Sequence, residues 1–455
     1  MNIILIIVIL YFALMLGIAW YFSRKENVNT YFLNNKKTGL WLMVFSNVAT
    51  LVGAGAVVAM VSEGYNSGIS YGLASIVLSM VGMIILAIFA KRLREYSEKN
   101  NIYSIADFYE KRYGSKNKKL LEILQPILMI IWVAVQVVAI SALASFLIGI
   151  NPTLAIVLAV GVTIIYTSLG GLKVDIITDF IQFWMILIIL IAIAIFGYIN
   201  IGGFSQLVSS VPKTHFNPFG FGGISWFVGM VLFSGFMYLG NGAHWQRILS
   251  AKDSEVAKKS YYWSIPFMII ISIIIIFLGL LAAAILSNIN QDQAIYLLMY
   301  ETLPTWMVGL GFAAILAVVT SSIDSLMIGG STIIYRQFID SENKKNSLFY
   351  ARLITVIFGI ISGIIAFIIP SIITLSLFGS YMALMFVPSV IAGFVSNKTS
   401  GKASFYSILF SVICLTVLYF FTPFSKSSFI LGLFIAIIFV LFYDKVFKNN
   451  TNKPF

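Results

Sequence analysis

The sequence has few charged residues and almost none of the residues that build metal clusters or disulfide frameworks. Only 10% of its 455 residues are charged, and it contains one cysteine, Cys414, and two histidines, His215 and His244. A single cysteine excludes a disulfide framework and a thiolate metal site, and two histidines cannot form a histidine cluster. No nucleophile–base pair can be assembled either, so we do not expect an enzyme.

The sequence is instead rich in hydrophobic residues, which make up 60% of the chain. Apolar runs of about 20 residues recur from end to end, which is typical of an all-α polytopic membrane protein. A transmembrane barrel is excluded because its strands are short and alternate apolar with polar residues. Thirteen apolar segments can be counted, at 3–23, 39–62, 70–90, 122–149, 153–169, 176–199, 223–246, 262–287, 305–335, 353–369, 372–395, 404–422 and 427–443.

The net charge is +12, and the Lys and Arg residues that produce it lie in the loops between these segments. This distribution indicates membrane topology and excludes nucleic acid as a partner. With the N-terminus outside, every Lys and Arg except Lys213 and Lys426 falls on the cytoplasmic side. We read segment 3–23 as a retained first helix and not a signal peptide. We therefore expect an integral protein of a bacterial cytoplasmic membrane, embedded in the lipid bilayer, with its C-terminus cytoplasmic. The sequence leaves the oligomeric state open, with a monomer as one option.

The ninth segment carries polar residues near its centre: Ser321, Ser322, Asp324 and Ser325. On a helix Ser321, Asp324 and Ser325 share one face. A carboxylate in the middle of a spanning helix costs about 2.5–3.5 kcal/mol on insertion scales, so we interpret this face as a proton or cation site that faces the protein interior. The alternative is that the serines are small contacts that bond back to the preceding turn.

Two segments are interrupted by small residues at mid-membrane. The second segment contains Gly53 and Gly55, and the seventh contains Gly240, Asn241 and Gly242. Such interruptions free backbone carbonyls, which is tolerable only where they line a cavity or bind an ion. The alternative is that the glycines only permit close helix packing.

Each interrupted segment begins a group of five, which indicates an inverted repeat with the substrate at its midplane. We expect one transporter domain that consists of a leading helix and loop (1–38), a first repeat (39–199), a second repeat (222–395) and two trailing helices with a tail (396–455). The polar loop 100–119 predicts a surface helix stabilised by anionic headgroups.

Three further polar positions lie near the ends of segments. Asp179 is either part of a cation route with Asp324 or a helix N-terminal acid stabilised by the dipole. Asp175 is interpreted as a plain interfacial charge, and Arg247 as a membrane anchor. Beside the second interruption, Asn241, His244 and Trp245 are candidates for contact with a substrate.

Several stretches together resemble the sodium:solute symporter family, whose members carry proline, pantothenate, sugars, sialic acid, choline and other small solutes. The resemblance runs from about residue 31 to 403 and rests on five motifs. These are YFLNNKKTGLWL, ATLVGAGAVV, GGLKVDIITDFIQ, WQRILSAK and AAILAVVTSSIDS.

The resemblance implies a fold like that of the bacterial leucine transporter, with alternating access coupled to inward sodium flow. It also implies a sodium ion bound by carbonyl and hydroxyl oxygens, the hard ligands that such an ion prefers. The positions that match are the carbonyls of Ala49, Val52 and Val318 and the hydroxyls of Ser321 and Ser322. In some relatives a second sodium lies near the positions of Asp179, Ser321, Asp324 and Ser325; here an Asp stands where those relatives have Ser, so a second sodium, a proton or neither remains open.

Departures from the family pattern reduce the number of small-molecule substrate classes that fit this chain. Where sugar carriers place Gln and Glu, this chain has Ala56 and Ser75, which disfavours a sugar. Leu51 and Asn241 stand at two aromatic-cage positions of choline carriers, which weakens a quaternary-ammonium site. An amino acid or carboxylate remains, bound by backbone N–H groups near Ala54, Gly55 and Ala56. The alternatives are a proton-coupled carrier that uses Asp324 and a choline-like sodium symporter.

Overall fold

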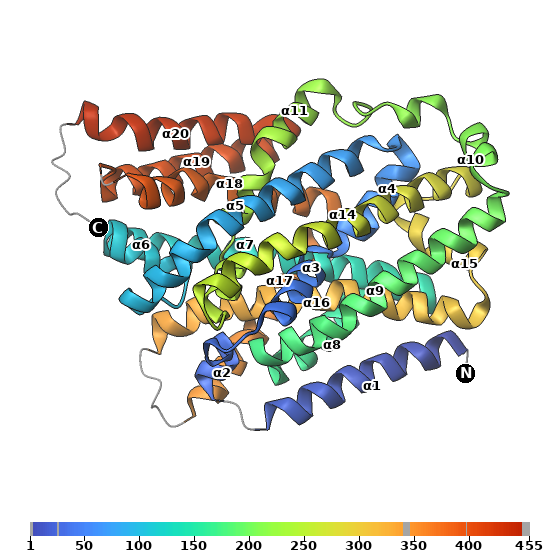
Figure 1. The fold of residues 1–455 in the computed structure, drawn as a ribbon, viewed down its shortest axis with the longest axis horizontal. Helices are drawn as coiled ribbons and strands as arrows, with labels where there is room; N and C mark the ends of the chain where they lie inside the picture. Colours follow the sequence, from blue (N-terminus) through green and yellow to red (C-terminus); the bar gives the residue numbers. More distant parts are fainter. Residues whose placement is uncertain (1–2, 25–26, 340–345, 397, 448–455) are drawn as a thin grey trace.

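Long apolar helices run side by side along the whole bundle (Figure 1). The structure is a computed structural model, and it describes residues 3–24, 27–339, 346–396 and 398–447. Its helices are α1 (Ile3–Ser23), α2 (Val28–Leu33), η1 (Asn34–Lys36), α3 (Leu40–Leu51), α4 (Ala54–Ser67), α5 (Ser70–Asn100), α6 (Ile105–Tyr113), α7 (Ser115–Ile148), α8 (Pro152–Leu169), α9 (Leu172–Ile201), α10 (Phe204–Ser210), η2 (Lys213–Phe216), α11 (Gly223–Phe233), η3 (Ser234–Phe236), α12 (Met237–Gly240), α13 (Gly242–Ser250), α14 (Ser254–Ile285), η4 (Gln291–Gln293), α15 (Ala294–Thr302), α16 (Thr305–Phe338), α17 (Ser347–Ile368), α18 (Ile372–Val395), α19 (Gly401–Phe421), η5 (Ser425–Ser427) and α20 (Ser428–Val446).

The all-α expectation is confirmed. Within the described ranges, 11 helices are long and apolar enough to cross a membrane, and the bent pair α3 and α4 raises the count to 12. The seventh apolar segment is divided among α11, η3, α12 and α13, so each of the thirteen segments corresponds to helical structure. β-type pairing in the described chain is limited to one isolated parallel bridge between Thr38 and Ala251.

The first interruption separates α3 from α4. α3 ends at Leu51, Val52 has φ −83° and ψ 61°, and Gly53 is the N-cap of α4. The two helices are bent by 47° at this point. Because Val52 leaves helical geometry, carbonyl groups of the last turn of α3 lose the intrahelical donors that they would otherwise accept from.

The second interruption separates α12 from α13. Asn241 is extended, with φ −99° and ψ 115°, and its side-chain oxygen accepts from Ala243 N–H at 3.0 Å, which caps α13. Gly240 packs against the Ala383 carbonyl of α18 so closely that a Cβ atom would overlap it. The position of this break therefore depends on a glycine.

The most enclosed spanning helices are α7, α16 and α18, whereas α1, α8 and α20 are mostly exposed at the edge of the bundle. α16 is buried along almost its whole length, and its polar residues therefore face protein and not lipid. This enclosure is what brings its serines against α3.

The expectation of a lipid-facing surface helix at 100–119 is wrong. α6 is the helix that forms there, and Ile105, Phe108 and Tyr109 are fully buried. Phe108 stacks on Phe394 with ring centroids 4.8 Å apart, and the Tyr109 hydroxyl donates to the Phe386 carbonyl at 3.0 Å. The apolar face of this amphipathic helix is covered by α18, so its pattern reflected packing against protein.

Candidate functional site

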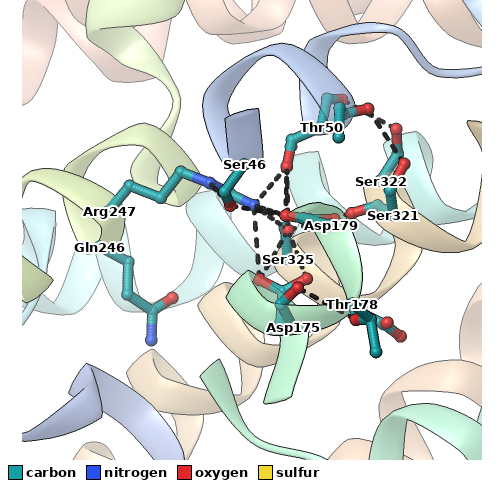
Figure 2. Close-up of polar contacts among 12 residues, drawn as sticks. Ser46, Thr50, Asp175, Thr178, Asp179, Gln246, Arg247, Ser321, Ser322 and Ser325 are labelled. Carbon is teal, nitrogen blue, oxygen red and sulfur yellow. Dashed lines mark hydrogen bonds and ion pairs between the residues drawn. The ribbon is translucent and has the colours of Figure 1, made fainter. Parts of the chain in front are cut away.

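Hydroxyl groups of α16 contact the free carbonyls at the first interruption. Ser321 Oγ donates to the Ala49 carbonyl at 3.0 Å and to the Val318 carbonyl at 3.1 Å, and Ser322 Oγ donates to the Thr50 carbonyl at 2.8 Å. Figure 2 shows Ser321 and Ser322 beside Thr50. Ala49, Val318, Ser321 and Ser322 are buried, and Thr50 is partly buried.

Val52 is fully buried, and the glycine after it lies against Ser322, because a Cβ atom on Gly53 would be 2.6 Å from Ser322 Oγ. The structure thus brings Ala49, Val52, Val318, Ser321 and Ser322 together around one break. The donor set consists of oxygen atoms only. It fits a small hard cation, since a hydroxyl can rotate from donating a hydrogen bond to offering a lone pair.

The residues predicted for a second cation are divided between two places. Asp179 Oδ2 accepts from Ser46 Oγ at 2.6 Å and from Arg247 Nη2 at 3.2 Å. Ser325 Oγ accepts from Arg247 and lies in the same cluster. Asp324, in contrast, accepts from Thr167 Oγ1 of α8 at 2.5 Å, so its carboxylate has a partner outside the cluster.

The interpretations of Asp175 and Arg247 as interfacial groups are wrong. Both side chains are buried, and Arg247 Nη2 lies 3.4 Å from Asp175 Oδ2. Arg247 extends from α13 across to Asp179, Ser46 and Thr50 (Figure 2). The sequence did contain a signal: two aspartates four residues apart share one face of a helix, and a buried pair of carboxylates needs a cation.

A cavity of about 150 Å³ adjoins the first interruption. Its lining includes five of the predicted substrate residues, which are Gly55, Ala56, Ser75, Asn241 and His244. Two predicted residues do not line it. Ala54 donates its N–H to Gln136 Oε1 at 2.9 Å. Trp245 is fully buried and donates Nε1–H to the Leu239 carbonyl at 2.8 Å.

Three polar atoms in the cavity wall are buried without a hydrogen-bond partner in the described structure: Trp132 Nε1, His244 Nδ1 and Ser376 Oγ. Burying such groups unpaired costs free energy, and a polar solute in the cavity is the natural partner for them. Among the described residues, the lining contains Ser, Thr, Asn, Gln and His but no Asp, Glu, Lys or Arg. The cavity therefore suits a solute with no net charge.

Two glutamines of α7 were missed from the sequence. Gln136 lines the cavity beside the first interruption. Gln125 lies at the second interruption, where Nε2 donates to the Gly240 carbonyl at 2.8 Å and Oε1 accepts from Gly242 N–H at 3.1 Å. Both are amides within an apolar run, and this is the signal that could have found them, because a polar group inside the membrane needs a partner.

The model of the sodium:solute symporter family matches residues 31–410 of the chain. A sodium/glucose cotransporter of Vibrio parahaemolyticus is 25% identical, over 89% of this chain and 82% of the relative. A sodium/proline symporter of Staphylococcus aureus is 25% identical, over 73% of this chain and 67% of the relative.

Among solved structures, a Na⁺-coupled sialic acid symporter in a substrate-bound outward-open state gives a TM-score of 0.83 at 19% identity and covers 98% of both chains. A nucleobase-cation-symport-1 family transporter gives a TM-score of 0.60 at 12% identity, over 92% of this chain and 94% of that chain. At these identities the likeness establishes the fold. It confirms the five-plus-five inverted-repeat architecture expected from the sequence.

Proposed function

Because the chain belongs to the sodium:solute symporter family, we propose that it couples sodium entry to the uptake of a small neutral or zwitterionic solute by alternating access. The observation that carries this proposal is that the cavity and the oxygen cluster have residues in common. Thr50, Gly53 and Ser322 line the cavity, and the same three residues form part of the oxygen cluster at the first interruption. An ion held there would fix the shape of the solute site, so each would raise the affinity for the other.

We propose that the sodium ligands are the carbonyls of Ala49, Val52 and Val318 and the hydroxyls of Ser321 and Ser322. The ion supplies the driving force, and the residues of the chain position the break around it. Asp179 and Ser325 are already bound by Arg247. We therefore assign them to holding that guanidinium in place, with Asp175 as a second counter-ion.

An amino acid, whose carboxylate and ammonium charges cancel, is the solute that the uncharged cavity lining favours over a simple carboxylate. The N-terminal end of α4 lies at the cavity and carries positive partial charge that favours a carboxylate. Ala54 N–H donates to Gln136 Oε1 and Ala56 N–H to the Gly53 carbonyl, so the helix dipole, and not a set of free N–H groups, supports this preference. Ala56 and Ser75, the positions that disfavoured a sugar, both line the cavity. Leu51 and Asn241 also line it and are not aromatic, which argues against a quaternary ammonium group.

For the membrane arrangement we propose the N-terminus outside and the C-terminus in the cytoplasm, since that places all Lys and Arg except Lys213 and Lys426 inside. The repeats would span 39–199 and 222–395, with 1–38 leading and 396–455 trailing. Each repeat then begins with an interrupted segment, and the cavity lies where the two interruptions meet.

The experiment begins with thermal unfolding of the purified chain against amino acids, carboxylates, sugars and quaternary amines, each with and without sodium. A ligand that binds only the folded chain raises its melting temperature. The strongest hit is then used in proteoliposome uptake. We expect uptake that requires an inward sodium gradient and a loss of about tenfold or more in sodium affinity in Ser322→Ala.

Ser331→Ala is the matched control, because Ser331 is also fully buried on α16 and lies away from the interruption. Sodium-independent uptake, or equal sodium affinity in both variants, would contradict the assignment. Asp324→Asn tests the proton-coupled alternative. We expect sodium-driven uptake to persist in that variant, since the Asp324 carboxylate does not line the cavity.

A further inference from the structure

A second and larger hollow, of about 1020 Å³, lies between α18, α20 and the segment that joins α11 to α12. Its wall is apolar over most of its length. Val395, Ile437 and Leu441 face it and remain 70%, 37% and 55% exposed, respectively. α20 lies at the edge of the bundle, and these three side chains remain exposed although α18 is otherwise enclosed, so in a bilayer the hollow is open to lipid.

The length of the hollow matches one leaflet. It extends along α18 from Leu384 to Ser396 and along α20 from Leu433 to Lys445. Twelve residues of helix rise by about 18 Å. Half of a hydrocarbon core of about 30 Å is about 15 Å. The hollow therefore begins at one membrane surface and ends near the midplane, as a single acyl chain does.

The polar end of the hollow is basic. Lys398 and Lys445 line it, together with Ser396, Thr399 and Asp444. Asp444, whose Oδ2 accepts from Ser400 N–H at 2.7 Å where α19 begins, offsets only one of the two lysine charges, so this end keeps a net positive charge. Behind this end, Arg112 donates to the carbonyls of Ser396 at 2.5 Å and Thr399 at 3.3 Å, which adds a further positive charge.

We propose that this groove binds one anionic phospholipid, with an acyl chain along α18 and α20 and the headgroup phosphate between Lys398 and Lys445. In the orientation proposed above, the basic end lies in the cytoplasmic leaflet, where anionic lipids are enriched. The groove follows the apolar length of one chain and ends in two cations, and this combination distinguishes a lipid site from a protein docking face.

The bound lipid would brace the wall of the solute cavity. Phe236 and Val387 line the groove, and their neighbours Met237 and Ala383 line the cavity. Gly240, at the second interruption, packs between Ala383 and Val387. Filling the groove therefore supports the contact between α12 and α18 from the lipid side.

Native mass spectrometry of the purified full chain tests the proposal, with phosphatidylglycerol and phosphatidylcholine of equal acyl length as probes. We expect one phosphatidylglycerol to bind more tightly than phosphatidylcholine. The double variant Lys398→Gln/Lys445→Gln should lower that preference by about tenfold or more, since each basic residue near an anionic surface contributes about a fivefold effect.

Lys258→Gln/Lys259→Gln removes the same charge from the start of α14, away from the groove, and should leave the preference unchanged. Ala392→Phe fills the groove wall without changing charge and should lower the binding of both lipids. Equal binding of the two lipids to the native chain, or equal losses in the two lysine pairs, would overturn the proposal. Displacement of the lipid by glycerol phosphate alone would also overturn it, because the occupant would then be a free anion. A dimer that carries no lipid would overturn it too, because the occupant would then be a second copy of the chain.

Discussion

Both interruptions border the cavity, but rotatable hydroxyls contact the carbonyls of the one between α3 and α4, whereas a side-chain amide bridges the one between α12 and α13. At the first, rotatable hydroxyls of Ser321 and Ser322 hold the carbonyls of Ala49 and Thr50. At the second, Gln125 binds a carbonyl on one side of the break and an N–H on the other, and it is fully buried. Because a hydroxyl can rotate, Ser321 and Ser322 can give up their hydrogen bonds to these carbonyls when a ligand binds there. The Gln125 amide instead holds the two sides of the second interruption together, which is a structural role.

The largest expected effect comes from the residue that links the two regions. Arg247 follows the second interruption on α13 and reaches Thr50, the residue before the last of α3. Arg247→Gln leaves Asp175 and Asp179 buried without a cation, which should cost about 3–5 kcal/mol of stability. Thermal unfolding in detergent measures this loss.

Asp175→Asn in the Arg247→Gln background should restore part of the lost stability, because one uncompensated charge is removed. Lys91→Gln is the control, since the Lys91–Glu255 pair is roughly half exposed and should contribute little. If Arg247→Gln melted like Lys91→Gln, the buried ion cluster would not be what holds the two regions together.

The next largest effect is a difference between the two glutamines of α7, one of which should matter more for stability and the other more for solute binding. Gln125→Met leaves the Gly240 carbonyl and the Gly242 N–H unpaired in the interior, at about 1–3 kcal/mol for each group. Gln136→Met removes one bond, to Ala54 N–H, from a wall that a solute can contact. We expect Gln125→Met to lower the melting temperature more, and Gln136→Met to lower solute affinity more. The reverse order would mean that the second interruption, and not the first, is the ligand site.

The smallest expected effect comes from substituting one glycine at each of the two interruptions, Gly55 at the first and Gly242 at the second. A Cβ atom on Gly55 would lie 3.3 Å from Ser376 Oγ, a hydroxyl that can rotate away. A Cβ atom on Gly242 would lie 3.0 Å from Gln125 Oε1, the acceptor of its own N–H. Gly55→Ala should therefore keep nearly the native melting temperature and weaken solute binding by a few-fold. Gly242→Ala should lower the melting temperature; equal melting temperatures in the two variants would contradict this difference.

Much of the fold could be predicted because it depends on local pattern. Apolar length gave the spanning segments, and Gly53 and Gly240–Gly242 placed the two interruptions. That Ser321 and Ser322 lie against Ala49 and Thr50 could not come from spacing, since the two helices are about 270 residues apart. Only the family resemblance placed them together before the structure did.

The failures have a common physical cause. Asp175, Arg247 and the apolar face of α6 are near segment ends, where sequence position alone suggests headgroups. Whether such a residue faces lipid or protein depends on which neighbouring helix covers it. α18 covers α6, and the break before α13 turns Arg247 inward. A pattern along one helix does not contain that information.

Gln125 and Gln136 are 11 residues apart on α7, about three full turns, so they project from the same side of one rod. Rotation of α7 about its long axis would swing both amides through the same angle. α7 is continuous from Ser115 to Ile148, so one helix contacts both interruptions at points about 16 Å apart along its axis. A turn of α7 would therefore move the partner of the Gly240 carbonyl together with a residue of the solute cavity.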